Sequence, residues 1–236
     1  GANIALFPIP GIADDGSLFA TTPIVPDAAL LARMASGAAV ILGKADSNLT
    51  RAAAAAKVAL HEYEADRQLM LLRAPAIVEG ALQHAIELTD VTIHASSVCV
   101  VGQGNIGKVL TSTLNALGAR VTVAARDPAQ RAYAYTLGAR TITTQALAEH
   151  AAEFDMLLST VPAPLVTPEV IDALPGHALV MDLSAPPGGC DLDYARRTGR
   201  PAVWARALGR RAPVTVGRSQ WLGIARIING ILEKGL

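Results

Sequence analysis

The sequence predicts an α/β protein with a doubly wound parallel sheet and a second, smaller N-terminal α/β domain. Two observations support this class. Hydrophobic residues make up 51% of the 236 residues, whereas aromatic residues make up only 4%. From Ser97 onward, short aliphatic runs alternate with Ala-rich helical segments that end at glycines. Buried parallel strands read as continuous aliphatic runs, and right-handed crossovers between them give a doubly wound sheet.

Six short runs in the second part of the chain are expected to be the strands of this sheet: residues 98–101, 120–124, 140–143, 156–159, 179–183 and 202–204. Helices are expected between them at residues 105–117, 128–137, 144–152, 168–174 and 192–198. Gly118 and Gly138 follow the first two of these helices, and glycine commonly ends a helix. The sequence therefore alternates strand and helix throughout this part.

The first ninety residues are less regular. Strands are expected at residues 3–7 and 38–42, and helices at residues 27–35, 49–56 and 76–88. Residues 7–26 contain four prolines and are expected to form a long loop. A last amphipathic helix is expected at residues 221–232. We therefore expect three parts: a smaller domain with a linking helix (1–90), the doubly wound domain (91–218) and a C-terminal helix returning to the first domain (219–236).

Charge and composition exclude several classes of protein. The 20 basic and 20 acidic side chains balance, whereas nucleic-acid binding needs a basic surplus. No apolar run approaches the roughly 20 residues that a membrane helix needs. No His/Cys group has metal-ligand spacing, and no signal peptide is visible. We expect a cytoplasmic protein with no metal, no membrane association and no nucleic-acid partner.

Residues 102–107 form the most informative motif. They read Gly-Gln-Gly-Asn-Ile-Gly, a G-x-G-x-x-G directly after a predicted strand and at the start of a predicted helix. The first glycine permits a tight turn, the second a close approach to a pyrophosphate, and the third close helix–strand packing. The helix N-terminus adds free N–H groups. This context predicts a Rossmann dinucleotide-binding domain with cofactor contacts from Gly102, Gln103, Gly104, Asn105, Ile106 and Gly107.

The end of the next predicted strand indicates which dinucleotide binds. An NAD site usually has Asp or Glu about 20 residues past the glycines to bind the ribose 2′-hydroxyl. Arg126 stands there instead, with Arg131 one turn into the following helix. A guanidinium fits a 2′-phosphate, so NADP is the expected cofactor. The open alternative is that Arg126 is a solvated side chain and that Asp127 contacts the ribose of NAD.

Segments on both sides of the glycine motif carry a family resemblance. Residues 78–82 read Val-Glu-Gly-Ala-Leu and residues 89–94 read Thr-Asp-Val-Thr-Ile-His. Residues 159–162 read Ser-Thr-Val-Pro, and residues 182–191 read Asp-Leu-Ser-Ala-Pro-Pro-Gly-Gly-Cys-Asp. In these segments the chain resembles the family of the dipicolinate synthase A subunit, which has Asn-Thr-Ile-Pro and Asp-Leu-Ala-Ser-x-Pro-Gly-Gly-Thr-Asp at the last two places. The resemblance covers about residues 60–217 and is partial at residues 208–209 and 212–217.

The resemblance implies an NADP-dependent oxidoreductase. It would oxidise a dihydropyridine or cyclic-imine dicarboxylate of the lysine pathway to a pyridine dicarboxylate, with a flavoprotein-like B subunit of the synthase as partner. We also expect a homo-oligomer. Family members carry an extra N-terminal βα unit, so the first domain is expected to be truncated or reduced. Further cofactor contacts are expected from Thr160, Val161, Pro162, Leu183 and Ser184.

Departures from the family lie at the substrate end. Arg73 stands where the family has Asn, Cys190 where it has Thr, Arg210 where it has Pro, and Val214 where it has Lys. We infer retained redox chemistry and leave an altered substrate open. The alternative, from another functional class, is a non-catalytic NAD(P)-binding subunit that senses the cofactor or organises a partner enzyme. Observed hydride transfer would distinguish the two.

A small anionic substrate needs cations or N–H donors, and its oxidation needs a proton acceptor. The candidates for substrate binding are Arg73, Gly188, Gly189, Arg206 and Thr215, with Arg210 and Arg211 as further cations. The candidates for the proton acceptor are Glu79, Asp191 and His94. The alternative interpretations are that Glu79 lies on a solvated helix face, that Asp191 only N-caps the next helix, and that the late arginines are solvated.

Overall fold

The computed structural model describes residues 1–8, 11–13, 15–64 and 66–233. These residues form two compact units. One unit contains the chain up to Leu72 and again from Val214, and the other contains Arg73–Pro213. Two long helices, α3 (Arg67–Leu88) and α9 (Pro213–Glu233), contain the two division points. The boundaries expected from the sequence, at residues 90 and 218, fall just after α3 and inside α9.

The second unit is built on a six-stranded parallel sheet in the order β6-β5-β4-β7-β8-β9. Its strands, in chain order, are β4 (Ser97–Val101), β5 (Arg120–Ala124), β6 (Arg140–Ile142), β7 (Met156–Ser159), β8 (Leu179–Asp182) and β9 (Ala202–Trp204). The chain reverses its direction of travel across the sheet between β4 and β7, which is the topological switch point where such folds bind ligands. The predicted doubly wound, Rossmann-type sheet is confirmed.

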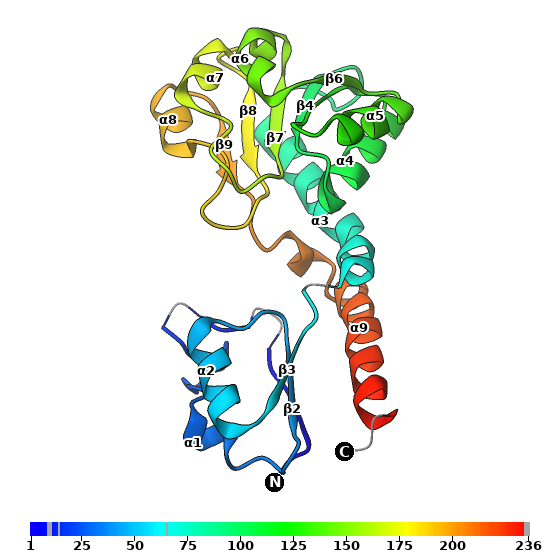
Figure 1. The fold of residues 1–236 in the computed structure, drawn as a ribbon. Coiled ribbons are helices and arrows are strands. Elements are labelled where there is room, and N and C mark those ends of the chain that lie inside the picture. Colours follow the sequence, from blue (N-terminus) through cyan, green and yellow to red (C-terminus); the bar gives the residue numbers. More distant parts are fainter. Residues whose placement is uncertain (9–10, 14, 65, 234–236) are drawn as a thin grey trace. The chain divides into compact units, whose positions relative to one another are not determined.

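Helices cover both faces of this sheet (Figure 1). They are α4 (Asn105–Ala116), α5 (Pro128–Thr136), α6 (Leu147–His150), α7 (Pro168–Ala173) and α8 (Leu192–Arg197), with 3-10 turns η1 (Thr144–Ala146), η2 (Ala151–Glu153) and η3 (Leu208–Arg211). Alternation along β4 produces two cores. Val98 and Val100 pack in a cluster with residues of α3 and α4, whereas Cys99 and Val101 pack in a cluster with residues of α6, α7 and α8.

The first unit contains a three-stranded parallel sheet in the order β1-β2-β3. Its elements are β1 (Ile4–Leu6), α1 (Ala28–Leu31), β2 (Ala39–Leu42), α2 (Ser47–Ala56) and β3 (Ala59–Glu62), together with the parts of α3 and α9 that fall in this unit. Val40 and Leu42 pack toward α1 and α2, while Ile41 packs with Leu69 of α3 and Ile224 of α9. The predicted smaller α/β fold is therefore confirmed.

Several elements differ from the sequence-based expectations. The helix expected at residues 27–35 is only Ala28–Leu31, and the one expected at residues 144–152 is a short α-helix between two 3-10 turns. Strand β3 was not predicted, because Ala-Leu-His-Glu is not an aliphatic run; it lies at the edge of its sheet. Helix α3 begins at Arg67 instead of residue 76, and Pro75 lies inside it. Helix α9 begins at Pro213 instead of residue 221. Proline at a first helical position costs no hydrogen bond, and a proline inside a long helix is tolerated with the loss of one.

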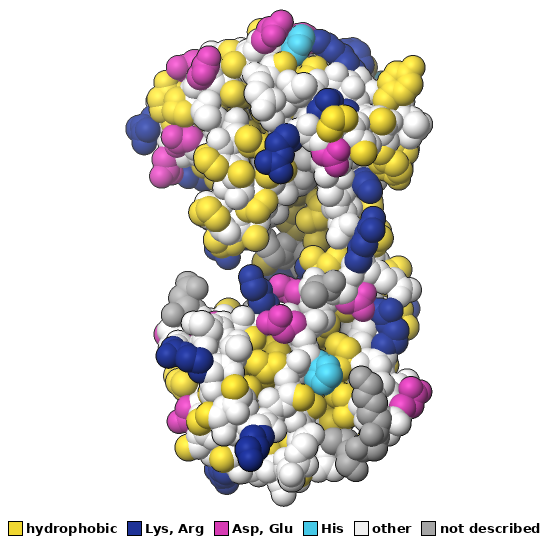
Figure 2. Space-filling model, viewed as in Figure 1, with side chains coloured by type: hydrophobic (Ala, Val, Ile, Leu, Met, Phe, Trp, Pro, Cys, Tyr) yellow, Lys and Arg dark blue, Asp and Glu magenta, His cyan; other side chains and the backbone are white. Residues whose placement is uncertain are grey.

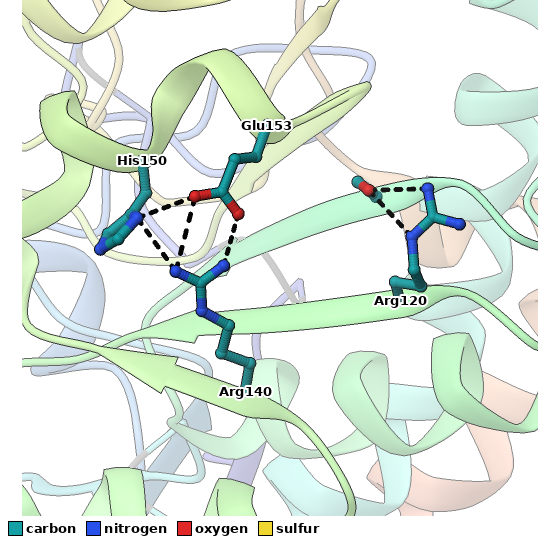
Figure 3. Close-up of polar contacts among 5 residues, drawn as sticks. Arg120, Arg140, His150 and Glu153 are labelled. Atoms are coloured by element: carbon teal, nitrogen blue, oxygen red, sulfur yellow. Dashed lines mark hydrogen bonds and ion pairs between the residues drawn. The ribbon is translucent and has the colours of Figure 1, made fainter.

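Two groups of polar side chains lie at the amino end of the larger sheet (Figure 3), one around Arg140 and one around Arg120. Arg140, the first residue of β6, pairs with Glu153, whose Oε1 lies 2.9 Å from Nδ1 of His150. Arg120, the first residue of β5, donates to the hydroxyl of Ser97 at 3.0 Å. The hydrogen bonds from Arg140 and His150 hold the pKa of Glu153 below its ordinary value. This end of the sheet is opposite to the carboxyl ends, where ligands bind in such folds.

The surface has no dominant charge. Figure 2 shows Lys and Arg side chains scattered among acidic and apolar ones on the visible face of each unit, in keeping with the formal net charge of zero. Within the described ranges, no helix is long and apolar enough to span a bilayer.

Candidate cofactor and substrate site

The glycine turn between β4 and α4 has a shape that only glycine can give. Gly102 has φ +93°, and a Cβ there would lie 2.4 Å from Cγ2 of Val161 and 2.7 Å from Oγ1 of Thr160. A Cβ on Gly107 would lie 2.3 Å from the carbonyl oxygen of Gly102. Gly104 differs, because no described atom lies within 4 Å of the place where its Cβ would be. Two glycines therefore close the turn, and the third leaves an open space above it.

The first turn of α4 faces this space with unpaired N–H groups. Gly104 is the N-cap of the 12-residue helix, and no side chain of the described residues caps it. Such a helix end is a ready anion site, because its free N–H groups and the helix dipole both favour negative charge. Ile106 packs against the core, and Asn105, the first residue of the helix, is half-buried. This end of the helix thus fits a phosphate group.

Gln103 contributes to the turn from the inside. Its side chain is 1% exposed, and its Oε1 accepts a hydrogen bond from the hydroxyl of Thr111 at 3.0 Å. The Nε2 atom has no partner among the residues that the structure describes. The side chain therefore braces the glycine turn against α4, and only the backbone of Gln103 can face a ligand.

A pocket of about 310 Å³ lies beside the turn at the carboxyl ends of β5 and β7. Ala124, Arg126 and Gln130 line one side of it, and Val161 and Leu165 line the other. Its apolar walls and the Arg126 cation suit a nucleoside that carries a negatively charged group. The pocket adjoins the switch point of the sheet, where a dinucleotide's adenosine half binds in folds of this kind.

Three charged residues in or next to the lining of this pocket have different roles. Arg126 is exposed and, within the described chain, its side chain forms no hydrogen bond or ion pair. Asp127 caps α5, with Oδ1 accepting from the N–H of Ala129 at 2.8 Å. Arg131 donates from Nη1 to the carbonyl oxygens of Ala125 and Arg126, both at 2.8 Å. Arg131, expected as a direct cofactor contact, is thus bound to the β5–α5 turn that carries Arg126.

The loop after β7 closes the pocket. The hydroxyl and the N–H of Thr160 donate to the carbonyl oxygen of Val101, at 3.0 and 2.9 Å. This fixes the loop beside the glycine turn, where Val161 lines the pocket. Pro162, expected as a cofactor contact, is exposed and does not line the pocket. The structure therefore brings Thr160 and Val161 together with Gly102, and their contacts with a cofactor stay a prediction.

The loop after β8 is organised by a residue that sequence reasoning did not single out as functional. Asp182 is 1% exposed. Its Oδ1 accepts from the N–H and the hydroxyl of Ser184, at 2.8 and 2.6 Å, and its Oδ2 accepts from the N–H groups of Gly189 and Cys190, at 2.6 and 3.1 Å. The available signal was an acidic residue ending an otherwise aliphatic strand, Leu-Val-Met-Asp. Ser184 and Leu183, expected to touch the cofactor, are both buried in this arrangement.

The two loop glycines use their N–H groups within the loop. Gly188 donates to the carbonyl oxygen of Ala185 at 3.0 Å, and Gly189 donates to Asp182. These amides, expected as donors to a substrate, are therefore already paired, because the loop closes on the carboxylate. A cation near this loop is Arg206, whose guanidinium lies 5.1 Å from the centre of the Trp204 ring. Trp204 is itself fixed by donating from Nε1 to the carbonyl oxygen of Ser184 at 3.0 Å.

The three candidate proton acceptors lie in different places. Glu79, on α3, forms an ion pair with Arg211 of η3. Asp191 N-caps α8 by accepting from the N–H of Tyr194 at 2.9 Å. His94 precedes β4 at the amino end of the sheet, with Nδ1 3.3 Å from the carbonyl oxygen of Leu117. The structure therefore does not bring His94 together with the cofactor loops.

The two remaining substrate candidates lie in different units. Arg73 is half-buried on α3, and its Nε has no hydrogen-bond partner in the described part of the chain. Thr215 is exposed on the first turn of α9. Arg73 falls in the second unit and Thr215 in the first.

Cys190 is held as a protonated thiol. Burial, followed by the negative charge of Asp182, raises its pKa well above the ordinary value. A thiol of this kind is a poor nucleophile, because the thiolate is the reactive form. Across the described ranges, no group of three His, Cys, Asp or Glu side chains could hold a metal ion.

Taken together, a parallel sheet with this strand order, a glycine turn open at Gly104 and a pocket at the switch point define a dinucleotide-binding domain of the dehydrogenase type. Residues 74–202 match the family model of the alanine dehydrogenase/PNT C-terminal domain. The chain is 31% identical to the A subunit of Bacillus subtilis dipicolinate synthase over 219 residues, which cover 92% of this chain and 72% of that protein.

Solved structures agree with this relationship. The crystal structure of the dipicolinate synthase A subunit from Bacillus halodurans matches with a TM-score of 0.89 and 28% identity, over 97% of this chain and 79% of that one. The Bacillus subtilis structure matches with a TM-score of 0.91 and 28% identity, over 98% and 79%. A transhydrogenase from Sinorhizobium meliloti, 22% identical with a TM-score of 0.73 over 88% of this chain and 72% of its own, shares the fold.

The chain belongs to the family of the dipicolinate synthase A subunit, among the NAD(P)-dependent dehydrogenases that carry an alanine dehydrogenase/PNT C-terminal domain.

Proposed function

We propose that this protein is an NADP-dependent oxidoreductase that converts a dihydropyridine or cyclic-imine dicarboxylate into a pyridine dicarboxylate or a close relative. The observation that carries the proposal is the open glycine turn at Gly104, beside a pocket lined by the cation Arg126. The relationship to a dipicolinate synthase supports this class of substrate, because dipicolinate is a pyridine dicarboxylate.

The residues present fit NADP. The N–H groups at the start of α4 would hold the pyrophosphate, since Gly104 leaves room where any other side chain would stand. The exposed guanidinium of Arg126 would meet the 2′-phosphate, and a planar fork of this type binds phosphate in two-point fashion. Asp127 also favours NADP over NAD. One of its carboxylate oxygens already accepts the capping hydrogen bond of α5, so the carboxylate is not fully free to bind a ribose hydroxyl.

Oxidation of a dihydropyridine ring removes one hydride and one proton. The nicotinamide ring, when bound, accepts the hydride. The protein must bind the two carboxylates and take the proton. We propose Arg206, held over the Trp204 ring, and Arg73, both in the second unit, as the cations that bind carboxylate groups. Gly188 and Gly189 would shape the loop, because their N–H groups are already paired.

We propose Glu79 as the proton acceptor. Of the three candidates, Asp191 already has a capping role and His94 lies at the far end of the sheet. Glu79 is exposed on α3, and its pairing with Arg211 holds the carboxylate in one place. A carboxylate that is fixed but still open to solvent can accept a proton and release it to water.

We also propose two kinds of protein partner. The name of the Bacillus relative marks it as one of several subunits. We propose that this chain likewise works with a second, flavoprotein-like protein and that it forms a homo-oligomer. Co-purification of the tagged chain with the product of a neighbouring flavoprotein gene would test the first, and light scattering of the isolated chain would test the second.

The function is tested by following NADPH absorbance at 340 nm with dihydrodipicolinate as substrate. The proposal predicts NADP-dependent turnover and a slower reaction with NAD. The variant Arg126→Asp should reverse that preference, because it removes the cation and supplies a carboxylate for the ribose hydroxyl. Tight NADPH binding with no turnover, also in the presence of the flavoprotein-like partner, would instead identify a non-catalytic cofactor-binding protein, which the departures at Arg210 and Val214 would then explain.

A further inference from the structure

Asp182 is a buried carboxylate that no basic side chain neutralises within the described chain. A charge in such a position is costly unless hydrogen bonds satisfy it. Here four donors do so, and they come from both ends of one loop: the N–H and hydroxyl of Ser184, and the N–H groups of Gly189 and Cys190. The carboxylate therefore closes residues 184–190 into a fixed shape.

The closed loop is attached in turn to the loop after β7. The carbonyl oxygen of Gly189 accepts from the N–H groups of Leu165 and Val166, at 3.2 and 3.0 Å, and the N–H of Asp191 donates to the carbonyl of Val166 at 3.0 Å. The contact is close, since a Cβ on Gly189 would lie 2.1 Å from the carbonyl oxygen of Val161. The two loops therefore hold one another in position.

The loop after β7 is a wall of the cofactor pocket. Val161, Ala163 and Leu165 all line it. We propose that Asp182 is a positioning residue that couples the cofactor pocket to the loop at residues 184–190, so that dinucleotide binding and the order of that loop depend on each other. This coupling is reciprocal, because the effect of one site on another is a single free energy. The proposal rests on the proposed function only in taking NADP as the ligand of the pocket.

The test compares two isosteric variants, Asp182→Asn and Asp155→Asn. Asp155 is the control carboxylate at the amino end of the sheet. It is partly exposed, its Oδ2 accepts from the N–H of Ser97 at 2.7 Å, and its Oδ1 lies 3.2 Å from Nε2 of His177. Asparagine at position 182 replaces one acceptor oxygen with an NH₂ group. This donor would face the N–H and hydroxyl donors that now bind the carboxylate. NADPH affinity is measured by fluorescence titration, and hydrogen exchange of residues 161–166 and 184–190 is measured with and without NADP.

We expect Asp182→Asn to bind NADPH at least fivefold more weakly than the wild type and to lose the protection of residues 184–190 that NADP confers. Asp155→Asn should stay within twofold of the wild type and keep that protection. Equal losses in the two variants would overturn the proposal, because they would report general destabilisation. Unchanged affinity and protection in Asp182→Asn would also overturn it.

Two further measurements keep the outcome decisive. If the wild type binds no NADPH, the proposed function fails, but the coupling is still read from exchange without nucleotide: Asp182→Asn should speed exchange in residues 161–166, and Asp155→Asn should not. If Asp182→Asn does not fold, Ser184→Ala removes only the hydroxyl bond to Oδ1. A two- to threefold loss of NADPH affinity in Ser184→Ala supports the proposal, and no change in affinity or exchange contradicts it.

Discussion

The guanidinium of Arg131 donates to the carbonyl oxygen of Arg126 across the first turn of α5, at 2.8 Å, and to that of Ala125 at the same distance. Arg131 thus fixes the backbone of Arg126. At the proposed 2′-phosphate site, the side chain of Arg126 is free to bind the phosphate, and Arg131 holds Arg126 in position.

Replacing Arg131 should therefore weaken cofactor binding without any lost contact to the cofactor. Each hydrogen bond contributes about 1 kcal/mol, so Arg131→Ala should lower NADPH affinity about three- to tenfold by fluorescence titration. Arg120→Ala is the control, because Arg120 donates to Ser97 at the other end of the sheet. An equal loss in both variants would show that the β5–α5 turn has no special part in binding.

A comparison of two variants should distinguish the proposed proton acceptor Glu79 from the capping carboxylate Asp191. Glu79→Gln should reduce kcat by a factor on the order of 100 and leave NADPH affinity unchanged, because general bases contribute rate and not cofactor binding. Asp191→Ala should cost about 1 kcal/mol in the free energy of unfolding, as expected for a lost N-cap, and keep most of kcat. A Glu79→Gln variant with wild-type kcat would remove Glu79 from the mechanism.

The group formed by Glu153, Arg140 and His150 should make the stability of the folded protein fall at acid pH. The pKa of Glu153 is lowered below its ordinary value of 4.5, chiefly by Arg140 and then by His150, so its carboxylate stabilises the folded state at neutral pH. That contribution is lost as the pH falls from about 4.5 through the lowered folded-state pKa. Thermal melts between pH 3 and pH 7 should show a shallower pH dependence for Glu153→Gln than for the wild type. NADPH affinity at pH 7 should be the same for both proteins; a loss in the variant would contradict the assignment of a purely structural role.

Gln220 should be a site where an apolar residue stabilises the first unit. Its side chain is 2% exposed on α9, and neither polar atom of its amide has a partner among the described residues. An unsatisfied buried polar group costs about 1–3 kcal/mol. Gln220→Met should therefore raise the free energy of unfolding, measured by urea denaturation, by about 1 kcal/mol. Gln145→Met, at an exposed position, should leave it nearly unchanged. A destabilised Gln220→Met protein would mean that the amide is satisfied in solution.

The larger sheet was predictable because its central strands β4, β7 and β8 are almost fully buried and because Gly118 and Gly138 follow two of its helices. The four residues of β4 expected from the sequence are all buried, which is what a run such as Val-Cys-Val-Val indicates. The smaller sheet was harder, since the edge strand β3 has no aliphatic run to identify it. The helix was expected to begin at residue 76, directly after Pro75, whereas α3 begins at Arg67 and continues through this proline.

The sequence predicts the part of the candidate site that the backbone of the glycine turn forms. It does not predict the hydrogen bonds that side chains such as Asp182 and Arg131 form. The glycine turn follows from residue type and spacing, so the tight turn at Gly102 and the close packing at Gly107 could be predicted, and the cofactor contact at Gly104 stays a prediction. The carboxylate of Asp182 could not, because its function depends on a loop that returns to it seven residues later at Gly189. For the same reason the sequence could not show that the Arg131 guanidinium binds the carbonyl oxygen of Arg126 in the β5–α5 turn.

The open space at Gly104 is where we place the pyrophosphate of NADP, and the proposed function depends on this placement. Gly104→Ala and Gly176→Ala are matched variants, since neither Cβ would meet another described atom within 4 Å. Both variants and the wild type are titrated with NADPH, after their thermal stabilities have been shown to be equal. We expect Gly104→Ala to bind NADPH at least tenfold more weakly than Gly176→Ala and the wild type. Equal affinity in all three proteins would show that the pyrophosphate does not bind there.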